Sequence, residues 1–169
     1  MVFPTFYWSS LVIPMLVLFP NLLFLFLPPI NTPLFQEKKE PLVLTILENV
    51  GRIGLIVIPL FYPITLSNNA SYFYLTCMLI SLLFYYAGWL RFFKLARDYA
   101  FLFLPLGHVP IPMAASPVLF FLFSAGVLHS LPMLIAAVVL AAGHLPLSYR
   151  EYQRVINQKV ANLQEQSHQ

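Results

Sequence analysis

A carboxylate and a guanidinium stand four residues apart inside a hydrophobic stretch. Glu48 is followed directly by Asn49 and, one helical turn later, by Arg52. Side chains at i and i+4 share one face of a helix, so Glu48 and Arg52 can pair and, with Asn49, form a polar site that reaches a lipid headgroup or a substrate. An ion pair at the membrane interface, with the arginine extended toward phosphate, would use the same residues.

Two histidines form a second set of candidates. His108 lies in a segment rich in proline and glycine, and His144 lies near the end of the last hydrophobic stretch. Imidazole titrates near neutral pH and can ligate haem axially, so the pair could relay protons or hold a haem. Histidines that only form hydrogen bonds within a helical bundle would give the same pattern. The cofactor is therefore left unknown.

A compact cationic patch with one carboxylate follows the third hydrophobic stretch, and its members are Arg91, Lys94, Arg97, Asp98 and Tyr99. Such a patch suits a lipid phosphate or another anionic headgroup, although the same charges also orient a membrane protein. Together the three sets predict one polar cluster at the cytoplasmic leaflet, made of Glu48, Asn49, Arg52, Arg91, Arg97, Asp98, His108 and His144.

Metal and nucleic-acid sites find no support in the sequence. Cys77 is the one cysteine, and no H-E-x-x-H spacing is present, so we predict no metal site. The formal net charge is +3, but the nine basic residues are scattered singly or in pairs between apolar runs. They form no basic stripe, so we expect no nucleic-acid partner.

Composition indicates which elements must position these residues. Of 169 residues, 60% are hydrophobic and 9% are charged, with a mean hydropathy of +0.80. A soluble domain carries roughly a quarter charged residues, so there are too few polar side chains here to coat a surface in water. We expect an all-α, polytopic integral membrane protein in the cell membrane, surrounded by the lipid bilayer.

Five hydrophobic stretches predict five transmembrane helices in a single bundle, because about 20 helical residues cross a hydrocarbon core of roughly 30 Å. They lie at about residues 7–27, 46–66, 72–90, 113–128 and 131–147. The segment 99–112 is apolar but broken by proline, so we predict that it lies in the interface, with a re-entrant dip as the alternative. Residues 149–169 are predicted to be a polar cytoplasmic tail in the form of a frayed helix.

Single residues within these spans suggest further detail. Pro14 and Pro20 should kink the first span and free backbone carbonyls, which neighbouring helices or the Asn21 amide should answer. Tyr85 and Trp89 are expected in an aromatic belt at the interface. The last span is rich in alanine and glycine, which predicts close helix approach and a central place in the bundle.

Charge asymmetry predicts the orientation. In a five-span arrangement all nine lysines and arginines fall on one side, and the positive-inside rule makes that side cytoplasmic. The N-terminus is then outside and the C-terminus inside.

The sequence leaves three functional classes open. The favoured one is a non-catalytic subunit, lipid-associated factor or accessory protein that binds a membrane-protein partner or a second copy of itself. The alternatives are a membrane-embedded enzyme or redox subunit with a site at the cytoplasmic leaflet, and a small dimeric transporter or channel.

Overall fold

The computed structural model describes residues 5–32, 40–107 and 111–167, and its elements are all helical. The main helices are α1 (Val12–Phe26), α2 (Leu42–Val57), α3 (Asn69–Lys94), α4 (Pro112–Val127) and α5 (Leu131–Ser167). Three single-turn helices accompany them, η1 (Trp8–Leu11), η2 (Ile58–Phe61) and η3 (Tyr99–Leu102). The candidate His108 lies outside the described residues.

Four of the described helical segments are long and apolar enough to span a membrane. They are Trp8–Phe26, Leu42–Phe61, Asn69–Lys94 and Leu131–Val160, and α4 is a shorter apolar helix. The all-helical character predicted from the sequence is therefore confirmed, with four helices long and apolar enough to span a membrane. At 1.5 Å per residue, the 16 residues of α4 cover about 24 Å.

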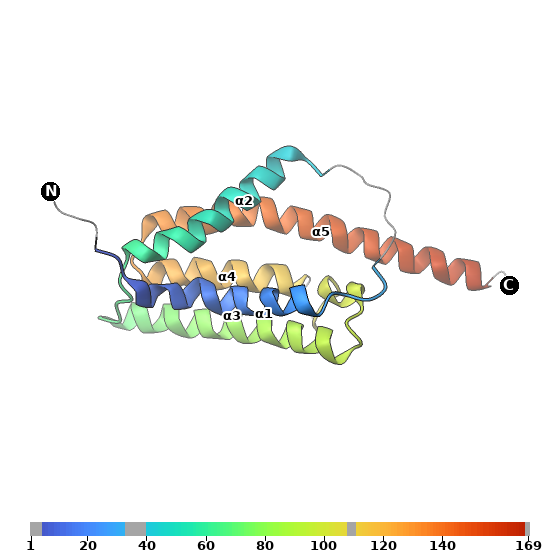
Figure 1. The fold of residues 1–169 in the computed structure, drawn as a ribbon, viewed down its shortest axis with the longest axis horizontal. Coiled ribbons are helices and arrows are strands. Elements are labelled where there is room, and N and C mark those ends of the chain that lie inside the picture. The colour runs from blue at the N-terminus through green and yellow to red at the C-terminus, as the bar shows by residue number, and fades with distance from the viewer. Residues whose placement is uncertain (1–4, 33–39, 108–110, 168–169) are drawn as a thin grey trace.

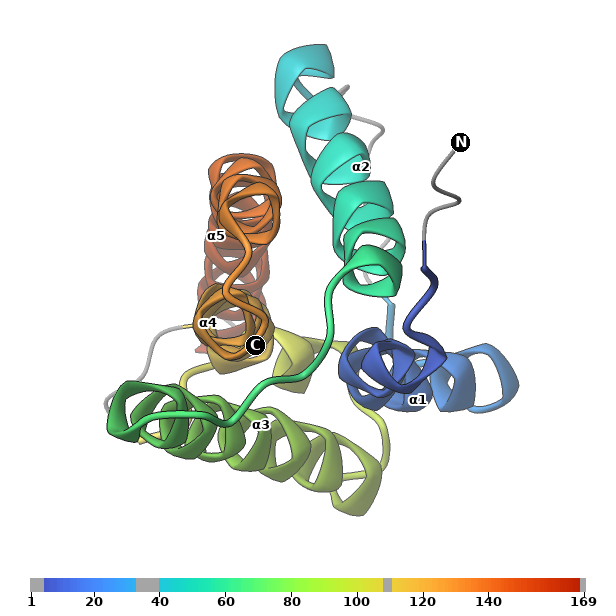
Figure 2. The same ribbon diagram turned by 90° about the vertical axis from the view of Figure 1, so that its left-hand side faces the viewer.

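The helices pack in the spatial order α3, α4, α5, α2, with α1 lying beside α3 (Figures 1 and 2). α4 is the most buried of them and carries ten buried residues, including Phe120 and Phe121. The alanine- and glycine-rich α5 packs on one side against α4 and on the other against α2. α5 thus has a packed neighbour on each of two sides, as its small residues predicted, and α4 is the more buried of the two inner helices.

Most predicted boundaries agree with the helices to within a few residues, but the second span ends early. We expected it to continue to residue 66, whereas η2 ends at Phe61 and Tyr62 is extended, with φ −129° and ψ 126°. Pro63 explains the difference, since the residue before a proline is pushed out of the helical region.

The prediction that a proline in the first span frees a backbone carbonyl, which neighbouring side chains then satisfy, is confirmed in α1. Pro20 has no N–H to donate, so the carbonyl of Leu16 loses its helical partner. The Tyr86 hydroxyl of α3 donates to that carbonyl at 2.8 Å. One residue on, the Asn21 amide nitrogen and the Tyr85 hydroxyl both donate to the Val17 carbonyl, at 2.9 and 3.2 Å. Side chains of α3 therefore complete the backbone of α1.

Glycines bring α2 and α5 close together. A Cβ added to Gly143 would lie 2.4 Å from the Glu48 backbone nitrogen and 2.6 Å from the Leu44 carbonyl oxygen. A Cβ on Gly51 would lie 2.5 Å from the Leu140 backbone nitrogen. Real Cβ atoms do not approach backbone atoms this closely, so both positions need glycine for the two helices to touch.

α5 runs without interruption from the bundle into the polar tail, past the ends of the other helices (Figure 1). Ion pairs from Arg154 and Arg150 to Glu40 tie this extension to the segment before α2. On its other side the Tyr99 hydroxyl donates to Glu151 at 2.8 Å. Burial and this hydrogen bond raise the pKa of Tyr99, so its phenol stays protonated and remains the donor.

Candidate functional site

A cavity of about 530 Å³ lies between the helices and receives side chains from all five of them. We call it the interhelical cavity. Most of its lining is apolar, and its main apolar residues are Val17, Leu18, Phe24, Leu55, Phe121 and Leu140. A smaller set of lining residues carries polar atoms, and these are Asn21, Arg52, Tyr85, Trp89, His144 and Ser148.

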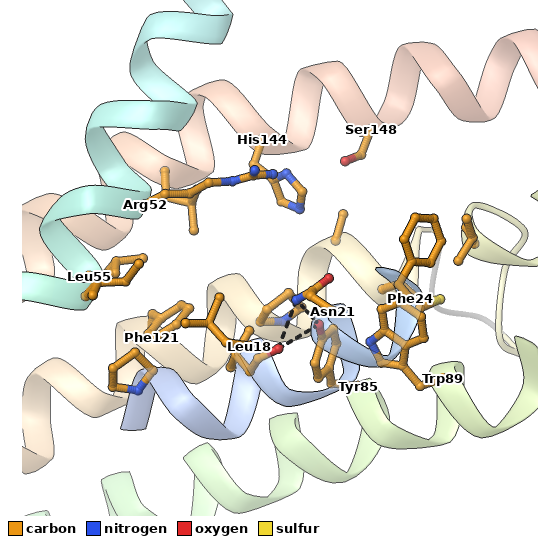
Figure 3. Close-up of a pocket in the computed structure, with 18 of the residues that line it drawn as sticks. Leu18, Asn21, Phe24, Arg52, Leu55, Tyr85, Trp89, Phe121, His144 and Ser148 are labelled. Atoms are coloured by element: carbon orange, nitrogen blue, oxygen red, sulfur yellow. Dashed lines mark hydrogen bonds between the residues drawn. The ribbon is translucent and has the colours of Figure 1, made fainter. Parts of the chain in front are cut away.

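The polar residues stand on two facing walls (Figure 3). Arg52 comes from α2 and His144 from α5, and their ends lie next to each other above the cavity. Asn21 and Tyr85 lie on the opposite wall, where the Asn21 amide nitrogen also donates to the Tyr85 hydroxyl at 3.0 Å. Apolar side chains line the rest of the cavity between these walls, so it is a mainly apolar cavity with polar groups on two sides.

Glu48 joins Arg52 and His144, the two side chains of the wall formed by α2 and α5, which we call the upper wall. Its Oε1 accepts from the Arg52 Nη2 at 2.5 Å and from the His144 Nδ1 at 2.7 Å. The Glu48 and His144 side chains are mostly covered, with 14% and 22% exposed, whereas Arg52 keeps 57% exposed. Glu48 thus forms a positioning group behind the wall, and Arg52 and His144 present the surface that faces the cavity.

The glycines of α2 and α5 explain why this cluster can form. Gly143 precedes His144 and lies against the backbone of Glu48, so the two helices touch next to the two side chains that pair. A larger residue at position 143 would push the helices apart. The short distance between Glu48 and His144 therefore depends on a backbone contact.

The other candidates in the described part of the chain do not line the interhelical cavity. Asn49 is exposed on the outer face of α2. Arg91 donates to the carbonyls of Phe101, Leu104 and Pro105 at 2.9, 2.6 and 2.6 Å, so its guanidinium fastens the segment after η3 to α3.

Asp98 and Arg97 also take part in local structure. The Asp98 carboxylate accepts from the Ala100 backbone N–H at 2.8 Å and caps η3. Arg97 adopts a left-handed conformation with φ 56°, and its carbonyl accepts from the Ile30 N–H at 2.9 Å. The structure therefore separates the predicted cluster into a cavity set, Glu48, Arg52 and His144, and a loop set, Arg91, Arg97 and Asp98.

Tyr85 and Trp89 were placed wrongly by the sequence. We expected them in an interfacial belt, but they are buried, with 3% and 5% exposed, and they line the interhelical cavity. The signal was present in their spacing, because Met78, Ser81, Tyr85 and Trp89 recur every three or four residues and are all buried.

Ser148 and His129 are two further polar residues of the bundle, and they lie at different places in it. Ser148 lies one turn beyond His144 on α5 and is largely buried. His129, at the turn before α5, lies 3.4 Å from the Ser71 hydroxyl and belongs to the opposite end of the bundle. Within the described ranges, no three His, Cys, Asp or Glu side chains gather in a way that could hold a metal ion.

Comparison with known proteins gives no relative from which a role could be carried over. The chain matches no protein-family model, no curated protein and no solved structure.

Proposed function

We propose that this protein is a non-catalytic membrane subunit or accessory protein that holds one amphiphilic, lipid-like molecule in the interhelical cavity. The observation that carries the proposal is the cavity itself. Its volume of about 530 Å³ falls within the roughly 300–1,000 Å³ of small-molecule sites, and its lining is apolar with a few polar groups. An acyl or isoprenoid chain suits such a lining. As an accessory protein, the chain would share this molecule with another membrane protein or a second copy of itself.

A buried donor supports a bound molecule. The Trp89 indole nitrogen is buried, and it makes no hydrogen bond of normal geometry in the described part of the chain, although the Tyr85 hydroxyl is close enough to interact with it. Buried polar groups almost always have a partner, and an unpaired one costs about 1–3 kcal/mol. Because Trp89 lines the cavity, an oxygen of a bound amphiphile would supply the missing acceptor.

The proposal includes a topology with five spans, in which α4 is the fifth membrane-crossing helix. Its ends lie beside those of its long neighbours α3 and α5, and local thinning of the bilayer can accommodate a short helix (Figure 1). Lys94, Arg150 and Arg154 lie toward the end where α5 extends. We propose that this end is cytoplasmic, that the start of α1 faces outward, and that the protein resides in the cell membrane.

An enzymatic or redox role has weaker support. Only part of the predicted polar cluster converges, since Arg91 and Asp98 are occupied in holding the loop around η3. The Nδ1 of His144 is engaged by Glu48. For transport, the cavity lining between Asn21 and Arg52 is mainly apolar, so the described residues form no continuous polar path from one to the other.

Native mass spectrometry of the protein purified in a mild detergent tests lipid binding. We expect an adduct with the mass of a single amphiphile. Ile56→Trp and Leu18→Trp place an indole in the cavity and should lower the fraction of protein that carries the adduct at least fivefold. Ile53→Trp and Leu22→Trp are the matched controls, because these exposed positions lie on the same helices outside the cavity. Equal occupancy in all four variants would contradict the proposal.

Sided cysteine labelling tests the topology. Cys77→Ser removes the one native cysteine, and single cysteines are then introduced at Ser67 and Gln158. A membrane-impermeant maleimide added to intact cells should label the cysteine at position 67 and leave that at position 158 unlabelled until the cells are opened. Labelling of both positions from outside would contradict the orientation.

A further inference from the structure

The polar end of the interhelical cavity indicates what kind of headgroup the bound molecule carries. We propose that Arg52 and His144 bind an anionic oxygen headgroup, a phosphate or a carboxylate, whose apolar chain lies along the cavity. This inference rests on the proposed lipid binding and adds the chemistry of the headgroup to it. The two side chains have hydrogen-bonding capacity left for such a headgroup.

Arg52 has most of its donors available. A guanidinium carries five N–H donors. Its Nη2 donates to Glu48, and Glu48 is the one hydrogen-bond partner of this side chain among the described residues. The side chain lines the cavity and is 57% exposed, so a ligand can reach the remaining donors. A planar guanidinium with free donors matches the two oxygens of a carboxylate or phosphate.

His144 adds a second group with a defined orientation. An ionised carboxylate can only accept, so the Nδ1 that lies 2.7 Å from Glu48 must carry the proton. The Nε2 is then the ring atom left for a ligand. In the imidazolium form of the ring, this atom is a donor that an anionic oxygen can accept from. Glu48 thereby fixes the ring in the way that carboxylates orient the histidines of many binding sites.

The balance of charge favours one anion. Glu48 and Arg52 carry one charge of each sign and balance each other. A singly charged headgroup that binds together with a proton on the His144 Nε2 keeps the set neutral, which lowers the cost of placing it in apolar surroundings. The other polar residues of the lining, Asn21, Tyr85 and Ser148, add no charge that would oppose it.

Trp89 offers a direct readout of binding. The chain has two tryptophans, and Trp8 is exposed at the other end of α1, so Trp8→Phe leaves Trp89 as the one fluorophore of its kind at the cavity. Dibrominated stearate and its methyl ester share one chain and differ in charge, and both quench indole fluorescence on contact. Dibrominated phosphatidic acid supplies the phosphate arm.

We expect the stearate and the phosphatidic acid to quench Trp89 at concentrations at least tenfold lower than the methyl ester. Arg52→Gln should bring the acid and the ester within about twofold of each other. Lys94→Gln removes an exposed cation away from the cavity and should keep the wild-type preference. Which of the two acids quenches at lower concentration assigns the headgroup to carboxylate or to phosphate.

The outcomes separate this inference from the function on which it rests. Equal quenching by acid and ester in the Trp8→Phe protein would overturn the anionic headgroup and leave lipid binding intact. Absence of quenching by all three probes would overturn both. Because the ester should still quench in the Arg52→Gln variant, its binding shows that this variant is folded.

Discussion

The two helix pairs that enclose the interhelical cavity are held together in different ways. α2 and α5 meet through their backbones at Gly51 and Gly143, with the Glu48, Arg52 and His144 cluster beside the contact. α1 meets α3 through the hydroxyl groups of Tyr85 and Tyr86, which donate to the Val17 carbonyl and to the Leu16 carbonyl left open by Pro20. The first contact depends on the absence of side chains and the second on their presence.

The two kinds of contact differ in how well they tolerate substitutions. A backbone contact cannot be relaxed by a rotamer, so any added atom at the α2–α5 crossing moves a whole helix. A tyrosine hydroxyl contributes one hydrogen bond, and its loss leaves the aromatic ring in place. We therefore expect the α2–α5 pair to be sensitive to small additions and the α1–α3 pair to lose stability in small steps.

The largest effect should come from the α2–α5 crossing. Gly143→Ala adds one methyl group 2.4 Å from a backbone nitrogen, so the helices must separate, and we expect about 3 kcal/mol of lost stability. Denaturant titration in a mild detergent measures this loss. Ala142→Leu, on the exposed side of the same turn, is the control and should change stability by less than about 0.5 kcal/mol. A Gly143→Ala protein as stable as this control would show that the two backbones do not touch.

The next largest effect concerns the charged cluster beside that crossing. Glu48→Gln removes the charge that both Arg52 and His144 contact, so we expect a loss of about 2 kcal/mol. Asn49→Ala changes the exposed neighbour of Glu48 and should be neutral. The same denaturant titration compares the two variants. Equal stabilities would show that the cluster does not help to hold α2 and α5 together.

A smaller effect should appear at the α1–α3 contact. Tyr86→Phe removes the donor to the Leu16 carbonyl, and we expect a loss of about 1 kcal/mol. Pro20→Ala restores a backbone N–H for that carbonyl, so Tyr86→Phe should cost almost nothing in the Pro20→Ala protein. A double-mutant cycle measures this coupling. Additive effects of the two changes would mean that the hydroxyl does not substitute for the missing helical bond.

The smallest effect should arise outside the two helix pairs, at the extension of α5. Glu40→Gln weakens the ion pairs to Arg150 and Arg154, which are partly exposed, so we expect a change of about 0.5 kcal/mol or less. The change should shrink further when the titration is repeated in high salt, because exposed charges are screened. A loss as large as that from Glu48→Gln would show that the extension contributes to the bundle.

The sequence predicts the existence of these elements better than their partners. Hydrophobic length indicated four of the long helices, and Pro20 with Asn21 indicated where α1 would need help from a neighbour. Periodicity and length act within one segment, so they can be read along the chain. The choice between α4 and α5 as the most buried helix depends on how several segments fit together, which no single stretch contains.

The candidate site shows the same limit. Glu48 and Arg52 are four residues apart, and their pairing could be predicted from helical spacing. His144 joins them across 96 positions of sequence, and only the packing of α5 on α2 brings it there. Arg91 and Asp98 have the charges that suit a headgroup. In the structure, however, Arg91 donates to backbone carbonyls and Asp98 accepts from a backbone amide, and these partners lie close to them in the sequence.

The continuity of α5 has a mechanical consequence. One helix carries His144 and Ser148 at the cavity and Arg154 at the clamp to Glu40, with no loop between these positions to absorb motion. Pro146 lies between His144 and Ser148, but α5 stays helical through this position. A change of tilt at the wall formed by α2 and α5 would therefore also displace the far end of α5. Binding of the proposed amphiphile would in this way be coupled to the position of the ion pairs at Glu40.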